Sequence, residues 1–203
     1  MVRERQGELD GGSGRPPPAL SDPDRGREDD RLLAAAFIER RDERAFRALY
    51  GRHSPALYGL LRRIVGGSEA QDVLQETWLR AVRGLSGFRW EGALRTWLTG
   101  IALNCARELR RAQGPPRAAA PEPGPRLPSL GQRIDLERAV DGLAEGYRTV
   151  LFLHDSQGYT HAEIAALLGV DEGTSKSQLS RARRAVRESL RGDAEPRGKG
   201  DGG

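Results

Sequence analysis

The fold of this chain is decided by residues 160–187, THAEIAALLGVDEGTSKSQLSRARRAVR, whose pattern predicts two short helices joined by a glycine turn. Thr160 and Glu163 have the spacing of a capping box, in which each side chain satisfies a backbone N–H at the exposed helix start. Gly169 can adopt the left-handed conformation that ends the first helix, and Asp171 is placed to cap the second. The stretch therefore predicts a helix-turn-helix.

The second of these helices has an apolar stripe and a basic face. Its apolar residues recur every three or four positions, which aligns them along one side. Between Glu172 and Arg191 there are six basic and two acidic side chains, whereas a solvated face usually mixes the two signs. Such a face can enter a major groove, where its first turns contact base edges and its arginines contact phosphates. The outward arc carries Lys176, Ser177, Ser180, Arg181, Arg184 and Arg187.

The composition indicates a protein of the cytoplasm. The 203 residues are 37% hydrophobic and 31% charged, and the net charge of +4 suits a polyanionic partner. No stretch approaches the roughly 20 apolar residues that span a bilayer, and the first thirty residues lack a secretory signal. The single cysteine, Cys105, excludes an internal disulfide. We therefore expect cytoplasmic localisation and no membrane insertion.

The chain is expected to be all-α, with two small helical domains joined by a flexible proline-rich linker. Residues 29–112 show helical periodicity throughout, and residues 132–191 lead into the helix-turn-helix. Residues 113–131 between them are rich in Pro, Ala and Gly, a composition that can neither continue a helix nor bury a core. The ends, residues 1–28 and 192–203, have no periodic apolar pattern and are expected to be disordered.

The sharpest amphipathic segment of the first domain is residues 68–83. Ser68 and Gln71 have capping-box spacing, and apolar residues occupy one half of the helical wheel. Leu79 lies in the middle of the opposite, polar half, which a solvated helix rarely shows. An apolar centre with a charged rim is typical of a docking surface. Its candidate residues are Asp72, Gln75, Glu76, Leu79 and Arg83.

Three segments carry a resemblance to a known family. They are DVLQETWLRAV at 72–82, WLTGIALNCARELRR at 97–111 and GYTHAEIAALLGVDEGTSKSQLSRARR at 158–184, in this order, with the proline-rich stretch between the second and third. Together they resemble the extracytoplasmic-function (ECF) sigma factors, a subfamily of the sigma-70 family of bacterial RNA polymerase. The resemblance covers about residues 32–191. It implies an alternative sigma factor that binds core polymerase and directs promoter recognition, melting and transcription initiation.

The resemblance also implies roles for residues in the first domain, which would correspond to region 2. The candidate docking residues would bind the clamp helices of the largest core subunit. The following loop and helix would melt the −10 element and hold a flipped base in a pocket at Phe88, Ile101 and Asn104. Stacking and a hydrogen-bonding amide can offset the cost of extruding a base. Trp90 is a further aromatic nearby, and Trp97 is expected to lie in the core. The basic residues expected to hold adjacent phosphates are Arg107, Arg110 and Arg111.

The second domain would correspond to region 4, which recognises the −35 element. The resemblance places Lys176, Ser177, Ser180 and Arg181 on the DNA-contacting positions. Gln178, where the family commonly has a basic residue, and Arg184 are expected to contact the −35 element as well. At Ser175 the family often has valine. This serine lies on the inward stripe, and we expect its hydroxyl to bond back to a carbonyl. The family further implies that an inhibitory anti-sigma factor is a possible partner.

Other functions find less support in the sequence. The histidines His53, His154 and His161 lack metal-ligand spacing, no glycine loop is suited to a phosphate, and Cys105 falls in an apolar helical stretch. We therefore expect no enzyme activity, no metal and no cofactor. Two alternatives stay open. A stand-alone helix-turn-helix regulator would bind an operator as a dimer without polymerase, and an adaptor would keep its activity after loss of Arg181 and Arg184.

Overall fold

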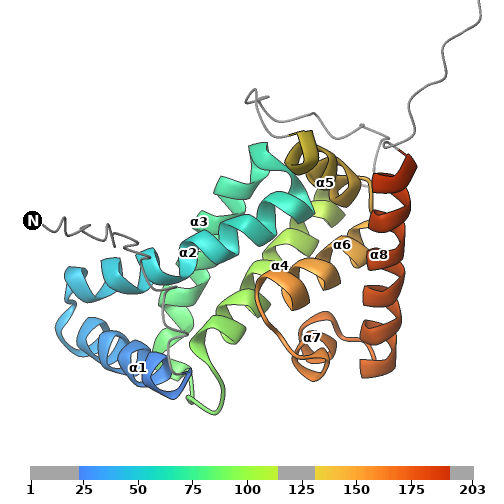
Figure 1. Ribbon diagram of the computed structural model, residues 1–203. Coiled ribbons are helices and arrows are strands. Elements are labelled where there is room, and N and C mark those ends of the chain that lie inside the picture. Colours follow the sequence, from blue (N-terminus) through green and yellow to red (C-terminus); the bar gives the residue numbers. More distant parts are fainter. Residues whose placement is uncertain (1–22, 114–130, 193–203) are drawn as a thin grey trace, which may run out of the picture.

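The computed structural model describes residues 23–113 and 131–192, and within these ranges every regular element is a helix (Figure 1). The all-α prediction is therefore confirmed. The predictions for residues 1–22, for the linker at 114–130 and for the tail at 193–203 fall outside the described residues.

Four helices and one short turn build the first domain. They are α1 (Pro23–Arg40), α2 (Glu43–Val65), α3 (Gly67–Gly84), the 3-10 turn η1 (Leu85–Gly87) and α4 (Leu94–Gln113). Asp42 caps α2 by accepting hydrogen bonds from the backbone N–H groups of Arg44 and Ala45. Large leucines from α2 and α4 are almost completely buried and form the centre of the core: Leu49, Leu60, Leu61, Leu94 and Leu98.

The first helix begins earlier than its composition indicates. Helix α1 starts at Pro23, so the prediction of disorder was wrong for residues 23–28. Proline is well suited to the first position of a helix, where its missing N–H is not needed. The start of α1 is held by Arg52 of α2, which donates to the backbone oxygen of Gly26 at 3.4 Å and to the buried carboxylate of Asp30 at 2.8 Å. Ion pairs leave no periodic pattern of apolar residues in the sequence. The helical periodicity therefore did not reveal the first turn of α1.

The start of α3 also differs from the prediction. A single residue, Gly66 at φ 94°, separates α2 from α3, so Ser68 already lies inside the helix and cannot act as its N-cap. The predicted capping box of Ser68 and Gln71 is therefore wrong. The Ser68 hydroxyl instead donates a hydrogen bond to the carboxylate of Glu69.

The second domain contains the helix-turn-helix. Helices α5 (Gly131–Asp141) and α6 (Glu145–Leu151) come first, and one π-helical turn, η2 (Phe152–Ser156), continues α6. Helices α7 (His161–Leu168) and α8 (Glu172–Gly192) follow. Thr160 and Glu163 form both hydrogen bonds of the predicted capping box, and Gly169 is left-handed at φ 70°. The helix-turn-helix prediction is confirmed.

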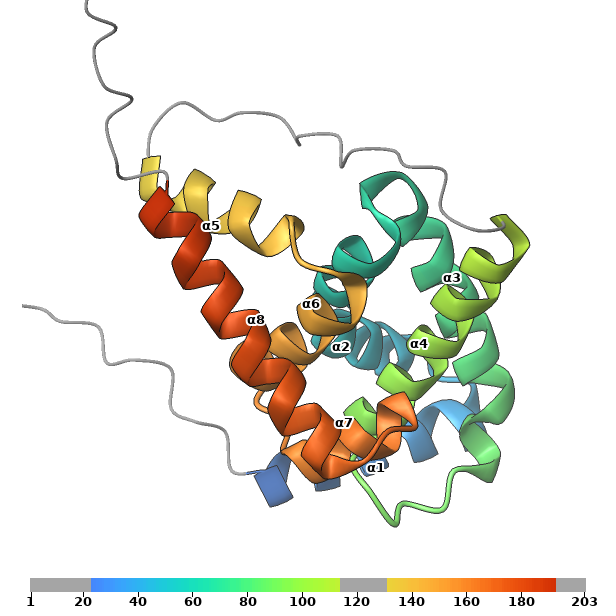
Figure 2. The ribbon, with the colours of Figure 1, turned by 90° about the vertical axis from the view of Figure 1, so that its right-hand side faces the viewer.

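The two domains pack against each other and share one apolar core. Helix α6 lies beside α2 and α7 beside α4, with α8 on the outer side (Figure 2). Residues of both domains, including Leu61 and Leu98 from the first and Tyr159 and Ile164 from the second, belong to one buried cluster. Both predicted helical domains are present, and they lie in contact with each other.

The second domain packs on the first because it is too small to bury its own apolar residues. Its own separate cluster holds four buried residues: Ala139, Leu143, Ala182 and Val186. So few side chains cannot cover the remaining apolar residues of α6 and α7, and a domain of about 60 residues buries too small a share of its surface to be more than marginally stable alone. Phe152 consequently packs against α2, where a Cβ at Gly59 would lie 3.2 Å from its ring.

Polar contacts also join the domains. The hydroxyls of Thr99 in α4 and Tyr159 share a buried hydrogen bond of 2.9 Å. Arg148 of α6 donates to the backbone oxygen of Arg63 at the end of α2, at 2.9 Å. Both hydrogen bonds form only while the domains are in contact, so they fix the relative orientation of the two domains in addition to the apolar packing.

Candidate nucleic-acid and polymerase interfaces

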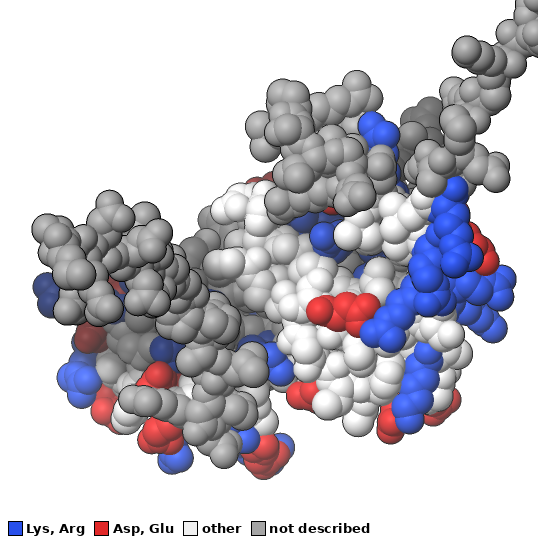
Figure 3. All heavy atoms as spheres, in the orientation of Figure 1, with Lys and Arg blue, Asp and Glu red and all other residues white. Residues whose placement is uncertain are grey.

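Helix α8 turns its apolar stripe inward and its basic face outward. Leu179 and Ala182 are buried against the domain, whereas the predicted DNA-contacting residues Lys176, Ser177, Ser180, Arg181 and Arg184 are exposed. Gln178 is half-buried. Figure 3 shows that Lys and Arg side chains gather along this edge of the molecule. The predicted orientation of the helix is confirmed.

Two cations of this face pair with acidic residues of the same helix. Lys176 lies 2.7 Å from Glu172, and Arg184 lies 3.1 Å from Glu188. The hydrogen bond from Lys176 also lowers the pKa of Glu172. Exposed pairs one helical turn apart contribute little to stability. Both cations can therefore exchange these partners for phosphates at small cost.

Ser175 links the two helices of the helix-turn-helix. It is completely buried at the start of α8, as its inward position predicts. Its hydroxyl lies 3.0 Å from Nδ1 of His161 at the start of α7, and not in the expected bond to a carbonyl. That expectation was wrong because a partner distant in sequence faces the hydroxyl across the turn.

His161 also lies against a second histidine. The rings of His161 and His154 have centroids 4.7 Å apart, and Nδ1 of His154 is 2.9 Å from a carboxylate oxygen of Asp155. Burial lowers the pKa of His161, and the charges of His154 and Lys176 lower it further. The folded domain therefore favours the neutral imidazole.

This arrangement predicts a pH-dependent stability of the helix-turn-helix. Because the pKa of His161 is lower in the folded chain than its unfolded value of 6.5, its stabilising contribution is present above pH 6.5 and is lost as the pH falls through the folded pKa. We expect the Tm to decrease on acidification below that pH and His161→Gln to flatten this part of the curve. Thermal unfolding of both proteins across the range measures the difference, and parallel curves would contradict the assignment.

The three predicted pocket residues of the first domain line one cavity. Phe88 follows η1, and Ile101 and Asn104 lie one helical turn apart on α4. The cavity has a volume of about 420 Å³. Its other lining residues are Gly92, Ala93, Thr96, Trp97, Gly100 and, from the second domain, Leu167. Aromatic and apolar side chains thus form its walls, with the exposed amide of Asn104 at its edge.

An aromatic group forms one side of this cavity. The Phe88 ring stacks on Trp97 with centroids 5.0 Å apart, and Trp90 meets Phe88 edge-on at 4.9 Å. Trp97 is partly buried and packs against the core cluster, and it lines the cavity as well, which its helical spacing with leucines did not indicate. Trp90 has a positive φ of 58°, a strained conformation that is often found at functional sites.

The three arginines predicted to hold phosphates near the pocket lie in different surroundings. Arg107 donates to the side-chain oxygen of Asn104 at 3.1 Å, so it is at the pocket edge. Arg111 is exposed one turn further along α4. Arg110 points elsewhere, because it donates to the backbone oxygen of Ile64 and lies 3.9 Å from Glu145. The structure places Arg107 beside Asn104 of the cavity and directs Arg110 towards the end of α2.

The predicted docking surface is an exposed face of α3. Asp72, Gln75, Leu79 and Arg83 are exposed, and the side chain of Glu76 is half-exposed. Leu79 is 47% exposed, whereas the opposite side of α3 is packed into the core. The predicted apolar centre with a charged rim is therefore present.

Arg80 fixes one edge of this surface. It donates to Glu76 at 2.7 Å and to both carboxylate oxygens of Glu108 in α4 at 2.9 and 2.7 Å. The hydrogen bonds from Arg80 lower the pKa of Glu108. Forked contacts of this kind have a defined geometry, so Glu76 is held in place by a network that extends to a second helix.

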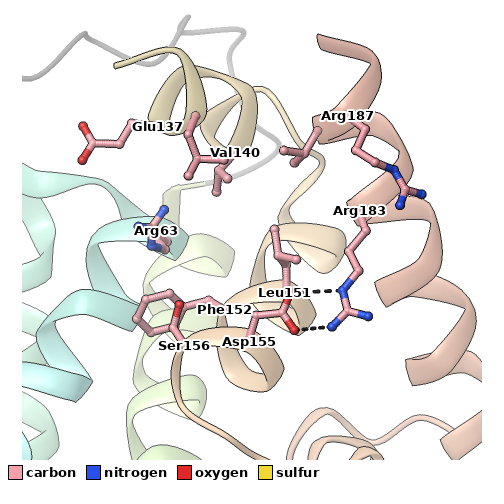
Figure 4. A pocket seen from close by; sticks show the side chains of 11 residues that line it. Arg63, Glu137, Val140, Leu151, Phe152, Asp155, Ser156, Arg183 and Arg187 are labelled. Carbon is pink, nitrogen blue, oxygen red and sulfur yellow. Dashed lines mark hydrogen bonds and ion pairs between the residues drawn. The ribbon is translucent and has the colours of Figure 1, made fainter. Parts of the chain in front are cut away.

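A second cavity opens between the end of α2 and helices α5, α6 and α8 (Figure 4). Its volume is about 560 Å³. Arg183 and Asp155 both line this cavity, and the guanidinium of Arg183 donates to the carboxylate of Asp155. These hydrogen bonds lower the pKa of Asp155.

Within residues 23–113 and 131–192 no group of three or more His, Cys, Asp or Glu is arranged to hold a metal. In the same residues no helix is long and apolar enough to cross a bilayer.

Comparison with known proteins assigns the family. Residues 49–115 match the family described as Sigma-70 region 2, and residues 133–186 match Sigma-70, region 4. The ECF RNA polymerase sigma factor SigM of Mycobacterium tuberculosis is 39% identical over 162 residues, which span 77% of this chain and 82% of SigM. The chain belongs to the ECF sigma factors. The sigma-E factor of Salmonella typhimurium is 30% identical over 168 residues, covering 73% of this sigma factor and 88% of the relative.

Solved structures agree with this assignment. The structure of CnrH in complex with the cytosolic domain of CnrY has a TM-score of 0.60 and 29% identity, covering 82% of this sigma factor and 99% of CnrH. RpoE of Bartonella quintana, solved with the anti-sigma factor NepR, has a TM-score of 0.58 and 25% identity, covering 73% and 98% of the two chains. The region 2 match contains the docking surface and the cavity at Phe88, and the region 4 match contains the helix-turn-helix.

Proposed function

We propose that this sigma factor uses three separate surfaces to direct core RNA polymerase to a promoter. The docking surface on α3 binds the clamp of the largest core subunit, the basic face of α8 binds the −35 element, and the cavity at Phe88 holds a flipped base of the −10 element. The observation that carries the proposal is the convergence of Phe88, Ile101 and Asn104 on one aromatic-walled cavity. A cavity of this kind offers stacking and an amide to a base taken out of its helix.

The chemistry of the cavity suits a base in a further respect. The hydroxyl of Thr96, which lines the cavity, is buried and has no hydrogen-bond partner among the described residues. A bound base can supply one, because nucleobases carry donors and acceptors on their edges. Arg107 at the cavity edge supplies a cation for the adjoining backbone phosphate.

An anti-sigma factor is included in the proposal as an inhibitory partner. The support comes from the related RpoE, which was solved with the anti-sigma factor NepR. Such a partner would act by covering the promoter-binding or polymerase-binding surfaces. Co-purification from cells that express the tagged chain tests whether one exists.

A sigma factor and a stand-alone helix-turn-helix regulator differ in whether they need core polymerase to bind their DNA site. A stand-alone regulator binds its operator as a dimer, tightly and without polymerase. The sigma factor is expected to form a one-to-one complex with core polymerase and to bind duplex DNA alone only weakly and with strong salt dependence. Size-exclusion chromatography with core polymerase tests this. Tight binding of a dimer to DNA without any association with core would contradict the proposal.

A double substitution tests the −35 surface. We expect Arg181→Ala with Arg184→Ala to weaken duplex binding on all sequences and to reduce the salt slope by about two, since each phosphate contact contributes about one. Both side chains are exposed, so folding should not change. Arg44→Ala with Arg47→Ala on α2 removes the same charge from another exposed site and is the matched control. Equal salt slopes for the two variants would show that α8 does not contact phosphates.

A further inference from the structure

A pair of histidines lies beside the basic face of α8. His154 belongs to the π-helical turn η2 and His161 begins α7, and the centroids of their rings are 4.7 Å apart. Both side chains are half-buried. A π-helical turn is rare and is frequently found at functional sites. The three surfaces proposed above leave this pair without a role.

The partner of His154 determines which of its ring nitrogens carries the proton. Nδ1 lies 2.9 Å from a carboxylate oxygen of Asp155, and Arg183 of α8 donates to the same carboxylate at 3.1 and 2.5 Å (Figure 4). The hydrogen bonds from Arg183 and His154 lower the pKa of Asp155, so this carboxylate is charged at neutral pH and can only accept. Nδ1 of His154 must therefore donate. In the neutral ring Nε2 is then an acceptor.

His161 has the opposite arrangement of donor and acceptor. Its Nδ1 lies 3.0 Å from the hydroxyl of Ser175, and this buried hydroxyl has no other partner among the described residues. Because a buried O–H group needs an acceptor, Ser175 donates to Nδ1, and the proton of the neutral ring lies on Nε2. Burial lowers the pKa of His161, which favours this neutral form. His161 is thus a donor without taking up a proton.

The charges that face the pair cancel while both rings are neutral. On α8, Lys176 pairs with Glu172 at 2.7 Å, and Arg183 pairs across to Asp155 of η2 at 2.5 Å. On α7 itself, the carboxylate of Glu163 is engaged in the capping box at the helix start. A proton added to the pair is therefore a positive charge beyond these ion pairs. A DNA phosphate is able to neutralise it.

The position of the pair brings it close to bound DNA. Lys176 is exposed at the start of the basic face and lies near enough to His161 for their charges to interact. When the second helix of a helix-turn-helix enters the major groove, the first helix crosses the DNA backbone. The Nε2 atoms of both rings make no hydrogen bond among the described residues and are not buried. Both are therefore free to contact a phosphate oxygen.

We infer that His154 and His161 together bind a backbone phosphate at the edge of the −35 surface, and that His154 takes up one proton from solvent as it does so. The inference rests on the proposed function, because the phosphate belongs to the DNA that α8 holds. A phosphate oxygen accepts, so neutral His161 donates to it directly, whereas Nε2 of His154 has to be protonated first. The added proton stays on Nε2 in the complex. Duplex binding therefore strengthens as the pH falls.

Duplex binding at different pH values tests the inference. Fluorescence anisotropy at low salt with a short duplex of arbitrary sequence is suitable, because phosphate contacts do not depend on sequence, and its dye must not titrate in this range. We expect the affinity of the wild-type chain to rise about fivefold from about pH 8 to about pH 6, as for a histidine whose pKa rises by about one unit on binding.

Two matched variants separate the roles of the histidines. Asparagine keeps a polar group near the position of Nδ1, so it preserves a partner for Asp155 in His154→Asn and for Ser175 in His161→Asn. We expect His154→Asn to lose the rise in affinity at low pH. His161→Asn should bind more weakly at every pH but keep the rise. The reverse result, with the rise lost only in His161→Asn, would overturn the assignment.

Proton uptake gives an independent measurement at neutral pH. Titration calorimetry at about pH 7, in two buffers of different ionisation enthalpy, should show uptake of about half a proton per bound duplex for the wild-type chain and none for His154→Asn. Duplex binding with no uptake and with the same affinity at every pH would refute the inference and leave the −35 surface in place. A wild-type chain that binds no duplex even at low salt would refute the −35 surface of the proposed function, and the inference with it.

Discussion

Glu76→Lys is expected to abolish co-purification of this sigma factor with core RNA polymerase. The substitution reverses a charge at the rim of the docking surface, next to exposed Leu79. Arg80 keeps its two hydrogen bonds to Glu108, so α3 and α4 stay joined while a cation replaces the carboxylate beside it. Like charges placed across an interface cost several kcal/mol, which is enough to reduce binding by a factor of at least about 100.

Glu43→Lys is the matched control for this experiment. Glu43 pairs with Arg47 one helical turn away, as Glu76 pairs with Arg80, but it lies at the start of α2. Both variants change the net charge equally and break one pair within a helix. Unchanged co-purification of Glu76→Lys, or equal losses in the two variants, would remove the docking assignment from α3.

Asn104→Ala is expected to impair promoter opening while leaving the complex with core polymerase intact. The amide is exposed at the cavity edge, so its loss should not alter folding. A lost hydrogen bond to a buried base costs about 1–3 kcal/mol, which corresponds to a decrease of roughly 5- to 150-fold in open complex. Permanganate reactivity of unpaired thymines in the −10 region measures opening directly.

Asn104→Asp removes the amide donor while it keeps the size and shape of the side chain. The carboxylate nearly matches the amide in size but cannot donate to a base, and it lies beside Arg107, the proposed phosphate contact. We expect it to open promoters no better than Asn104→Ala. Normal thymine reactivity in both variants, with normal binding to core, would show that Asn104 has no part in holding the melted strand.

Local chemistry predicted the parts of the fold that neighbouring residues determine. The Thr160 and Glu163 capping box, the left-handed Gly169 and the inward stripe of α8 follow from spacings of a few residues, and the structure has all three. The exposed Leu79 on α3 could be found in the same way, because a helical wheel fixes which side each residue occupies.

Contacts between distant segments could not be predicted in this way. The bond of Ser175 to His161, the position of Arg110 against α2 and the anchoring of α1 by Arg52 all depend on partners that no local pattern identifies. The packing of α7 on α4 is a further example, because no local pattern predicts that the two domains contribute to one buried cluster. Trp97 shows a further limit, since one side chain serves both the core and the cavity.

The central claim is that this chain gives promoter specificity to a polymerase that lacks its own specificity subunit. Run-off transcription tests it most directly, with purified core polymerase and templates selected by immunoprecipitation of the chain and sequencing of the bound DNA. We predict a discrete transcript that needs both core polymerase and the chain and is lost with Glu76→Lys. Transcription that is the same with and without the chain, on templates that the chain binds by itself, would contradict the account.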